Sequence, residues 1–441
     1  MKKFASTIIF SAVLMTTTAT AQTCEWTLQE CTNYAVENNL SVKRTEDNLH
    51  RQEIQLNTAK NAYLPSVNAS VDQNFSFGRG LTADNTYSNT NTRSTSFNLG
   101  ASVNLFNGFQ PKNNVELSKL NLAASTADLE KAKNDIRLQV AQAYVEILYN
   151  MEIEDVARRQ IEIDSAQVAR LEAFVANGKA SEAELSQQKA SLANSNLTYT
   201  QAVNNRKLAL LNLSQLLELP SAGDFTIQRP DTFSIENEEL SIENYQSTIN
   251  YDRPEIKAEE IRLESTEYSL RIAKGQALPS LNLSAGMGTN YYNSSNGFKA
   301  ESFGKQLDNN FSQYIGLNLN IPIFNRFQVR NNIRDVKIQR ESQQHSLELA
   351  RKNLYKEVQQ ASLNAENANA KVVAAREAVR NAETAFRLAQ AKYENGKSTI
   401  TEFNESKNTL LKSQSDLTQA VYQRMYSIMI LKWYQGEEMG W

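Results

Sequence analysis

The sequence predicts a mainly α-helical fold with membrane-crossing β-strands, built from one structural unit that occurs twice. Three observations carry this prediction. Short motifs recur at a fixed spacing, two segments in each half alternate between apolar and polar residues, and most of the remainder follows a seven-residue period. A duplicated unit with these periods gives four transmembrane strands and long, coiled-coil-like helical hairpins.

The duplication is visible in three short motifs. The segment Phe106–Phe109 returns 218 positions later as Phe324–Phe327, and Asn177–Lys179 returns at the same offset as Asn395–Lys397. The motif Leu-Pro-Ser at 64–66 returns 214 positions later. The offset changes by four residues between the Pro-Ser and Phe-Asn motifs, as expected when one polar loop differs in length between two copies.

The N-terminus has the composition of a secretory signal. Two lysines precede an apolar stretch from Ile8 to Met15, and the small residues Ala19-Thr20-Ala21 suit a cleavage site. The sequence therefore divides into a signal peptide at 1–21, a first repeat at 22–220, a linker at 221–240 and a second repeat at 241–441. Without Lys2 and Lys3 the chain carries 44 basic and 49 acidic residues, a balance that gives no indication of nucleic-acid binding.

Each repeat contains two segments of strict alternation, and their polar faces are rich in Asn, Ser and Gly. The alternating positions of each segment span 9 to 11 residues, which matches the ~9 to 11 that a tilted strand needs to cross a bilayer. A soluble sandwich with one covered face is the alternative. Polar links at 78–94 and 293–312 are expected to be exposed loops. The apolar positions are Val67, Ala69, Val71, Phe75 and Phe77; Phe97, Leu99, Ala101, Val103 and Leu105; Leu281, Leu283, Ala285, Met287 and Tyr291; and Ile315, Leu317, Leu319, Ile321 and Ile323.

The heptad segments predict two very long helices, Lys112–Ala176 and Gln328–Glu394. The first would be about 97 Å long at ~1.5 Å per residue, which no compact core requires. Shorter helices are predicted at Leu28–Ala62, where Thr27 and Glu30 form a capping box, and at Ser181–Leu217. Each Asn-Gly pair ends a long helix, so Asn177-Gly178 and Asn395-Gly396 mark the tips of two helical hairpins.

Four membrane-crossing strands leave two sheet edges unpaired, and unpaired backbone groups cannot face lipid. Two, three or four copies would supply 8, 12 or 16 strands to a shared barrel. Only a ring wide enough for a lumen suits the polar inner faces. Cyclic symmetry would then gather the helical hairpins into a matching tube.

These motifs resemble the TolC-like family of outer-membrane efflux and secretion channels over essentially the whole mature chain. The resemblance rests on Leu-Pro-Ser before a strand, Phe-Asn-Gly-Phe after the second strand, and the two tips, the second of which reads Tyr393-Glu394-Asn395-Gly396. It implies a homotrimer with a 12-stranded barrel in the outer membrane and a periplasmic α-helical tunnel. It also implies a periplasmic adaptor protein as partner, coupled to an inner-membrane pump or ABC exporter.

The resemblance also assigns site residues. Glu402 and Glu405 take the positions of an acidic ring at the periplasmic entrance, where carboxylates would favour cations. Tyr393 and Glu184 match a tip contact that holds the entrance shut, although Ser398 stands where an arginine of that contact is expected. The tip residues expected to contact the adaptor are Asn177, Gly178, Lys179, Asn395, Gly396 and Lys397. Ordinary solvated charges and simple packing are the alternative interpretations.

No catalytic, cofactor or metal motif appears in the sequence, so an enzyme is not predicted. Its two histidines, His50 and His345, stand apart in helical regions. Cys24 and Cys31 are the only cysteines, and an exported setting would allow either a disulfide between them or two free thiols. The best alternative function is a periplasmic coiled-coil adaptor, which also uses long helical hairpins but needs no duplicated strand pairs.

Overall fold

The structure is a computed structural model that describes residues 25–81, 86–220, 225–229, 252–295 and 301–437. The predicted signal peptide at 1–21 and most of the linker at 221–240 lie outside these ranges. The chain forms two compact units. The first contains residues 1–40, 135–249 and 358–441, and the second contains 41–134 and 250–357.

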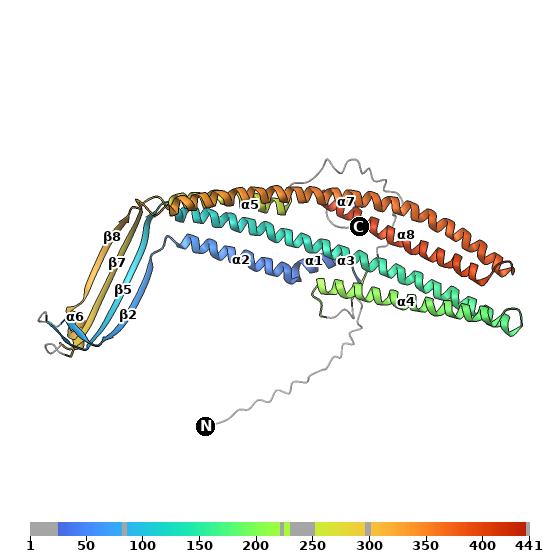
Figure 1. The fold of residues 1–441 in the computed structure, drawn as a ribbon, viewed down its shortest axis with the longest axis horizontal. Coiled ribbons are helices and arrows are strands. Elements are labelled where there is room, and N and C mark those ends of the chain that lie inside the picture. Colours follow the sequence, from blue (N-terminus) through green and yellow to red (C-terminus); the bar gives the residue numbers. More distant parts are fainter. Residues whose placement is uncertain (1–24, 82–85, 221–224, 230–251, 296–300, 438–441) are drawn as a thin grey trace, which may run out of the picture. The chain divides into compact units, whose positions relative to one another are not determined.

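The second unit holds a four-stranded antiparallel sheet. Its strands are β2 (Ser66–Ser76), β5 (Thr92–Asn107), β7 (Ser280–Ser294) and β8 (Ser312–Asn320), in the spatial order β2-β5-β7-β8 (Figure 1). The four predicted strands are confirmed. The pairing of β5 with β7 joins the two repeats, because β5 ends the first strand pair and β7 begins the second.

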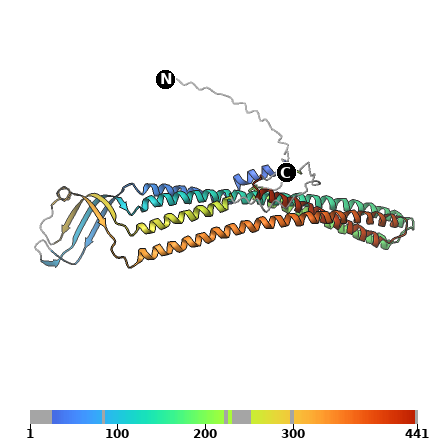
Figure 2. The same ribbon diagram turned by 90° about the horizontal axis from the view of Figure 1, so that it is seen from above.

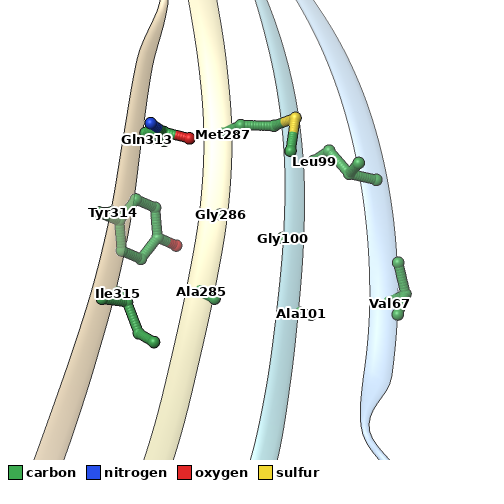
Figure 3. A pocket seen from close by; sticks show the side chains of 10 residues that line it. All are labelled: Val67, Leu99, Gly100, Ala101, Ala285, Gly286, Met287, Gln313, Tyr314 and Ile315. Carbon is green, nitrogen blue, oxygen red and sulfur yellow. The ribbon is translucent and has the colours of Figure 1, made fainter.

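The register of the sheet places like residues side by side. Leu99 lies opposite Met287 on the apolar face, and Gly100 lies opposite Gly286 on the other. Small side chains on the two central strands leave a depression of about 490 Å³, which Figure 3 shows with its ten lining residues. The ring of Tyr314, on β8, lies over Gly286, where a Cβ would be only 2.8 Å from Tyr314 Cε1. Glycine at 286 therefore makes room for this ring.

The polar links between paired strands contain short elements that the sequence did not predict. Within the first link, β3 (Arg79–Leu81) pairs with β4 (Tyr87–Asn89). Within the second link lies the short helix α6 (Phe303–Asn309), whose residue Phe303 packs on Phe97 and Tyr291 of the sheet. The described parts of these links are mostly exposed, and the short elements form within the predicted loops because each link folds back on itself or on the sheet.

The long helices form as predicted. The helix α3 (Gln110–Ala176) is followed by α4 (Glu182–Leu216), and α7 (Gln328–Glu394) is followed by α8 (Ile400–Tyr434). Figures 1 and 2 show each pair folding back at a tight turn. Among the described residues, none of the helices has the length and apolar composition needed to cross a membrane.

One predicted helix is divided in two. The segment Leu28–Ala62 forms α1 (Leu28–Asn38) and α2 (Leu40–Asn61), with Asn39 between them in an extended conformation. The Asn39 side chain donates a hydrogen bond to the carbonyl of Leu216 at the end of α4 (3.0 Å), and Leu40 N donates to Glu218 (3.3 Å). These contacts with the C-terminal end of α4 and the residues after it, far away in sequence, favour the break. No Pro or Gly in the sequence marks this position. The capping box of Thr27 and Glu30 is confirmed.

The duplication extends to whole elements. The helix α5 (Pro254–Gly275), which the sequence analysis did not identify, has 22 residues like α2 and lies 214 positions after it. The helices α3 and α7 both have 67 residues, and α4 and α8 both have 35, at an offset of 218. The offset is 214 for α2 and 218 for α3, so it changes within the strand pair and link that lie between these two helices.

The first unit contains a small parallel sheet of β1 (Glu25–Trp26) and β6 (Thr226–Ile227). The hydroxyl of Tyr144, on α3, lies 3.1 Å from the carbonyl oxygen of Trp26 and 2.6 Å from that of Gln228. Tyr144 is 1% exposed, and burial raises the pKa of its phenol. Part of the predicted linker is thus a strand anchored on the long helix.

Candidate functional site

The hairpin tips are the candidate site, and both are built on the same helix ending. Gly178 and Gly396 have φ values of +70° and +67°, the left-handed region that glycine adopts without strain. At the first tip Gly178 N donates to Val175 O (2.9 Å) and Lys179 N donates to Phe174 O (2.8 Å). This pair of bonds is the Schellman motif, which satisfies the last carbonyls of the helix.

The second tip repeats this geometry. Gly396 N donates to Tyr393 O (3.0 Å) and Lys397 N donates to Lys392 O (2.8 Å). The side chains of Asn177 and Asn395 each donate to the carbonyl four residues earlier, both at 2.7 Å. All six predicted tip residues are exposed. The tips are therefore hydrogen-bonded turns that expose Asn, Gly and Lys to solvent.

Each returning helix begins with a hydroxyl cap and an acidic residue. Ser181 and Glu184 form a capping box at the start of α4, and Thr399 accepts a hydrogen bond from Glu402 N (3.2 Å) at the start of α8. The hydroxyl of Ser398 donates to the Glu402 carboxylate. Ser398, the position that departs from the family pattern, thus orients one of the two predicted entrance carboxylates.

Glu405 lies one turn further along α8. Both Glu402 and Glu405 are exposed. Glu405 lines a polar groove of about 460 Å³ together with Lys412 and with Gln187 of α4. Gln187 also donates a hydrogen bond to Thr401 (3.3 Å), which joins the first turns of the two returning helices. The side chains of the two glutamates are therefore exposed to solvent at the tip end of α8, where ions can reach them.

Tyr393 lies in an apolar cluster that ties the two tips together. Its ring stacks on Phe403 at 5.3 Å, and both pack with the buried residues Leu171 and Ile400. Burial raises the pKa of the Tyr393 phenol, and the nearby Glu184 carboxylate raises it further. Tyr393 is therefore a neutral hydroxyl near Glu184. Packing accounts for the ring, and the role of the hydroxyl in holding the entrance shut stays a prediction.

A buried ion pair that the sequence analysis missed lies behind the tips. Lys407 of α8 donates to Asp164 of α3 at 2.5 Å, and the two side chains are 2% and 0% exposed. Lys407 also donates to Ser191 (2.9 Å). The Asp164 carboxylate accepts three further hydrogen bonds, from Gln160 (3.0 Å), Gln188 (3.0 Å) and Ser195 (2.5 Å). This polar network joins the first hairpin to the second.

A sequence signal for this network exists. Asp164 and Lys407 both occupy positions where the three- and four-residue spacing of apolar residues in a packed helix predicts another apolar residue. Asp164 follows Ile161 by three residues, and Lys407 follows Phe403 by four. Charges at such positions are rare unless they are paired. Glu154, which stands seven residues after Ile147 and seven before Ile161 in the seven-residue period of α3, likewise pairs with Arg206 of α4 at 2.5 Å. Interruptions of the apolar pattern thus marked ion pairs between helices.

The cysteine prediction is only partly visible in the structure. Cys31 is fully buried, and burial together with the Glu30 charge raises the pKa of its thiol form to about 12. Cys24 lies outside the described residues, so the Cys24–Cys31 disulfide stays a prediction. The described part of the chain holds no group of His, Cys, Asp and Glu able to bind a metal ion.

The four-stranded sheet with two tipped hairpins is the protomer fold of outer-membrane channels of the TolC-like class. Solved structures share it. The outer-membrane protein VceC from Vibrio cholerae superposes with a TM-score of 0.75 at 18% identity, covering 94% of this chain and 97% of that one. The CmeC outer-membrane channel of Campylobacter jejuni gives the same score and identity, covering 94% and 87%.

The chain belongs to the outer membrane efflux protein family, whose model matches residues 32–218 and 247–429. It is similar to the outer membrane efflux protein BepC of Brucella suis, with 22% identity over 88% of this chain and 80% of that protein. It is also similar to the pyoverdine export outer membrane protein OpmQ of Pseudomonas aeruginosa, with 25% identity over 86% and 78%.

Family membership settles the broad function. The protein is an outer-membrane exit channel of the kind that serves tripartite efflux systems, with a large periplasmic helical portion. The family and the fold are those of channels rather than enzymes. The alternative of a periplasmic adaptor is wrong, because both repeats match the channel family and each carries a strand pair.

Proposed function

We propose that three copies of this chain form the exit duct and that its tips dock on a periplasmic adaptor, which connects the duct to an inner-membrane pump or ABC exporter. The observation that carries the proposal is the four-stranded sheet, whose edge strands β2 and β8 each pair on one side only among the described residues. Three copies supply the strands for a closed barrel wide enough to hold a water-filled lumen.

The tips suit an adaptor surface. Both are hydrogen-bonded, exposed turns with a lysine immediately after the glycine, and residues of both hairpins pack in the apolar cluster around Phe403. Because each copy presents two such turns, a trimer would offer six similar docking points around one axis. The partner proteins, which provide the energy for export, would determine which substrate is transported.

Glu402 and Glu405 are proposed to form the acidic ring at the periplasmic entrance. Three copies would bring six carboxylates to a constriction, where a ring of this charge attracts cations and repels anions. The exposure of both side chains and the fixed orientation of Glu402 by Ser398 support this role. The ring would set ion selectivity without any chemical step.

Planar-bilayer recording tests the ring. The double variant Glu402→Gln with Glu405→Gln is expected to lose most of the cation selectivity and the block by multivalent cations. Glu182→Gln, which removes an exposed carboxylate from the first turn of α4, is the matched control and should leave both unchanged. Unaltered selectivity and block in the double variant would remove the ring from the proposal.

The contact of Tyr393 with Glu184 is proposed to hold the entrance closed. Tyr393→Phe keeps the ring stacked on Phe403 and removes only the hydroxyl. We expect a higher single-channel conductance or open probability, because the hydroxyl no longer bonds to the first hairpin. Leu388→Ala, an exposed residue of α7, serves as control. Conductance equal to the parent would leave Tyr393 with a packing role alone.

A further inference from the structure

The two outer edges of the four-stranded sheet need strands to pair with, and the internal repeat of the chain indicates which strands these are. In the described residues, β2 pairs only with β5, and β8 pairs only with β7. The free edges carry backbone groups that need partners in a membrane. We infer that β8 pairs in antiparallel fashion with β2 of a second copy, in a register fixed by the internal repeat. This inference rests on the proposed homotrimer and adds its interface.

The repeat predicts strand registers correctly where this can be checked. Adding 214 to a β2 residue and 218 to a β5 residue converts the first strand pair into the second. Ser66↔Ser102 becomes Ser280↔Asn320, and Ser70↔Asn98 becomes Ser284↔Gly316, which are the pairs seen between β7 and β8. Every pair of the β7–β8 ladder is reproduced, so the two repeats obey one register rule.

The same rule gives the pairing between copies. Within one chain, β5 of the first repeat pairs with β7 of the second repeat. Between copies, β8 of the second repeat would pair with β2, which belongs to the first repeat of another chain. Shifting β5 residues forward by 218 and β7 residues back by 214 converts Gly100↔Gly286 into Asn318 opposite Asp72 of the second copy. In the same way Ser96↔Asn290 becomes Tyr314↔Ser76, Asn98↔Gly288 becomes Gly316↔Asn74, and Ser102↔Ser284 becomes Asn320↔Ser70.

The faces of the two strands agree with this register. On the apolar face Ile315 would lie opposite Phe75 of the second copy, and Leu319 opposite Val71. A shift by one residue would turn the apolar face of one strand toward the polar face of the other, so it is excluded. Shifts by two residues keep the faces matched, so only the register derived from the internal repeat distinguishes the inferred pairing from such shifts. The inferred pairs run from 314↔76 to 320↔70.

Beyond Asn320 the inferred pairing ends near Pro322. The β5–β7 ladder shifts register between Asn104 and Phe106. The corresponding positions after β8 are Pro322 and Phe324, and proline cannot donate a ladder hydrogen bond. At the helix end, Gly108 packs so closely on Gly275 that a Cβ at Gly108 would lie 2.1 Å from Gly275 O. The corresponding residues between copies are Arg326 and Asn61, whose side chains forbid that approach, so this junction is wider.

Cysteine crosslinking in isolated outer membranes tests the register. Asn318→Cys is combined in turn with Asn68→Cys, Ser70→Cys, Asp72→Cys, Asn74→Cys and Ser76→Cys, all on one face of β2. A bifunctional thiol reagent of about 5 Å matches the Cβ separation of directly opposite residues, whereas a displacement by four residues adds about 13 Å. The parent chain, with its own two cysteines, supplies the background.

We expect the yield of covalent trimer to peak at Asp72→Cys and to fall to the background at Asn68→Cys and Ser76→Cys. A peak at Ser70→Cys or Asn74→Cys would overturn the register while leaving the trimer intact. The mass of the uncrosslinked particle in detergent is measured in parallel. A monomeric mass would remove the proposed trimer itself, so the two failures are distinguishable.

Discussion

At the scale of single residues, Asp164 and Lys407 form a fully buried ion pair with hydrogen-bond partners on neighbouring helices. A buried carboxylate and a buried ammonium group are tolerated here because each has hydrogen-bond partners beyond the other: Asp164 accepts from three neighbouring side chains and Lys407 donates to Ser191. Such a pair adds little stability compared with an apolar pair, but the loss of one member is costly. It therefore specifies how α8 sits on α3 and α4.

Lys407→Met tests this role. The variant leaves the Asp164 carboxylate buried without its cation, so we expect a loss of about 3 to 5 kcal/mol in the stability of the tip region. Adding Asp164→Asn should restore part of that loss. Lys189→Met breaks the exposed pair with Glu172 (2.8 Å) and should cost at most ~1 kcal/mol. Thermal unfolding followed by helical circular dichroism gives the comparison, and equal costs for the two lysines would contradict the assignment.

Cys31 offers a second test at this scale. Because burial raises the pKa of its thiol from 9.0 to about 12, the unfolded state loses this proton at a lower pH than the folded state. The contribution to stability is therefore constant below about pH 9 and falls by ~1.4 kcal/mol per pH unit as the pH rises toward 12. Cys31→Ala should remove this part of the pH dependence.

Maleimide labelling without reductant completes that test. In the folded protein Cys31 should not react at pH 8, since it is fully buried. After unfolding in denaturant, labelling of two thiols per chain would rule out the Cys24–Cys31 disulfide, and labelling of none would establish it. Labelling of Cys31 before unfolding would show that the first unit is more open than its burial indicates.

At the scale of elements, the glycines that end or join helices fall into two kinds. Gly178 and Gly396 need glycine only for the left-handed φ, because a Cβ would meet nothing within 4 Å. Gly108 has a φ of +56° and also lies against the backbone of Gly275. The tip glycines thus set a conformation, whereas Gly108 also permits the close passage of two chain segments.

We expect Gly178→Ala to cost about 1 to 2 kcal/mol, the strain of a left-handed alanine. Gly108→Ala should cost clearly more, because its Cβ would overlap Gly275 O and one backbone must move. The fraction of chain recovered as heat-resistant oligomer from membranes measures the difference. If the two substitutions were equivalent, the close approach at Gly108 would not be maintained in the assembled protein.

At the scale of the whole molecule, the two repeats have equal helices but unequal surroundings. Asp164 corresponds to Ala382 and Lys407 corresponds to Lys189 at the offset of 218, so the buried ion pair has no counterpart in the other repeat. Likewise, the Gly108–Gly275 contact corresponds to Arg326 and Asn61. Contacts inside a protomer have therefore been specialised, while the strand register has stayed common to both repeats.

This difference predicts where the assembly comes apart. In the proposed trimer the junction between copies would have Arg326 and Asn61 in place of Gly108 and Gly275 and would lack the buried ion pair, so subunits should separate before protomers unfold. Heating in mild detergent, followed by mass measurement and circular dichroism in parallel, should show loss of the trimer at a lower temperature than loss of helix. Coincident transitions would indicate that the protomer has no independent stability.

The sequence by itself determined the features that depend on local periodicity. Alternation located all four strands, the heptads located α3 and α7, and Asn-Gly located both tips, because each pattern is a direct consequence of strand or helix geometry. It also assigned the family, through motifs repeated in the same order. Only the tertiary structure decided the break at Asn39, the buried pair of Asp164 and Lys407, and the neighbourhood of β5 and β7. These depend on partners 173 or more residues away in sequence, and no local pattern encodes the identity of such a partner.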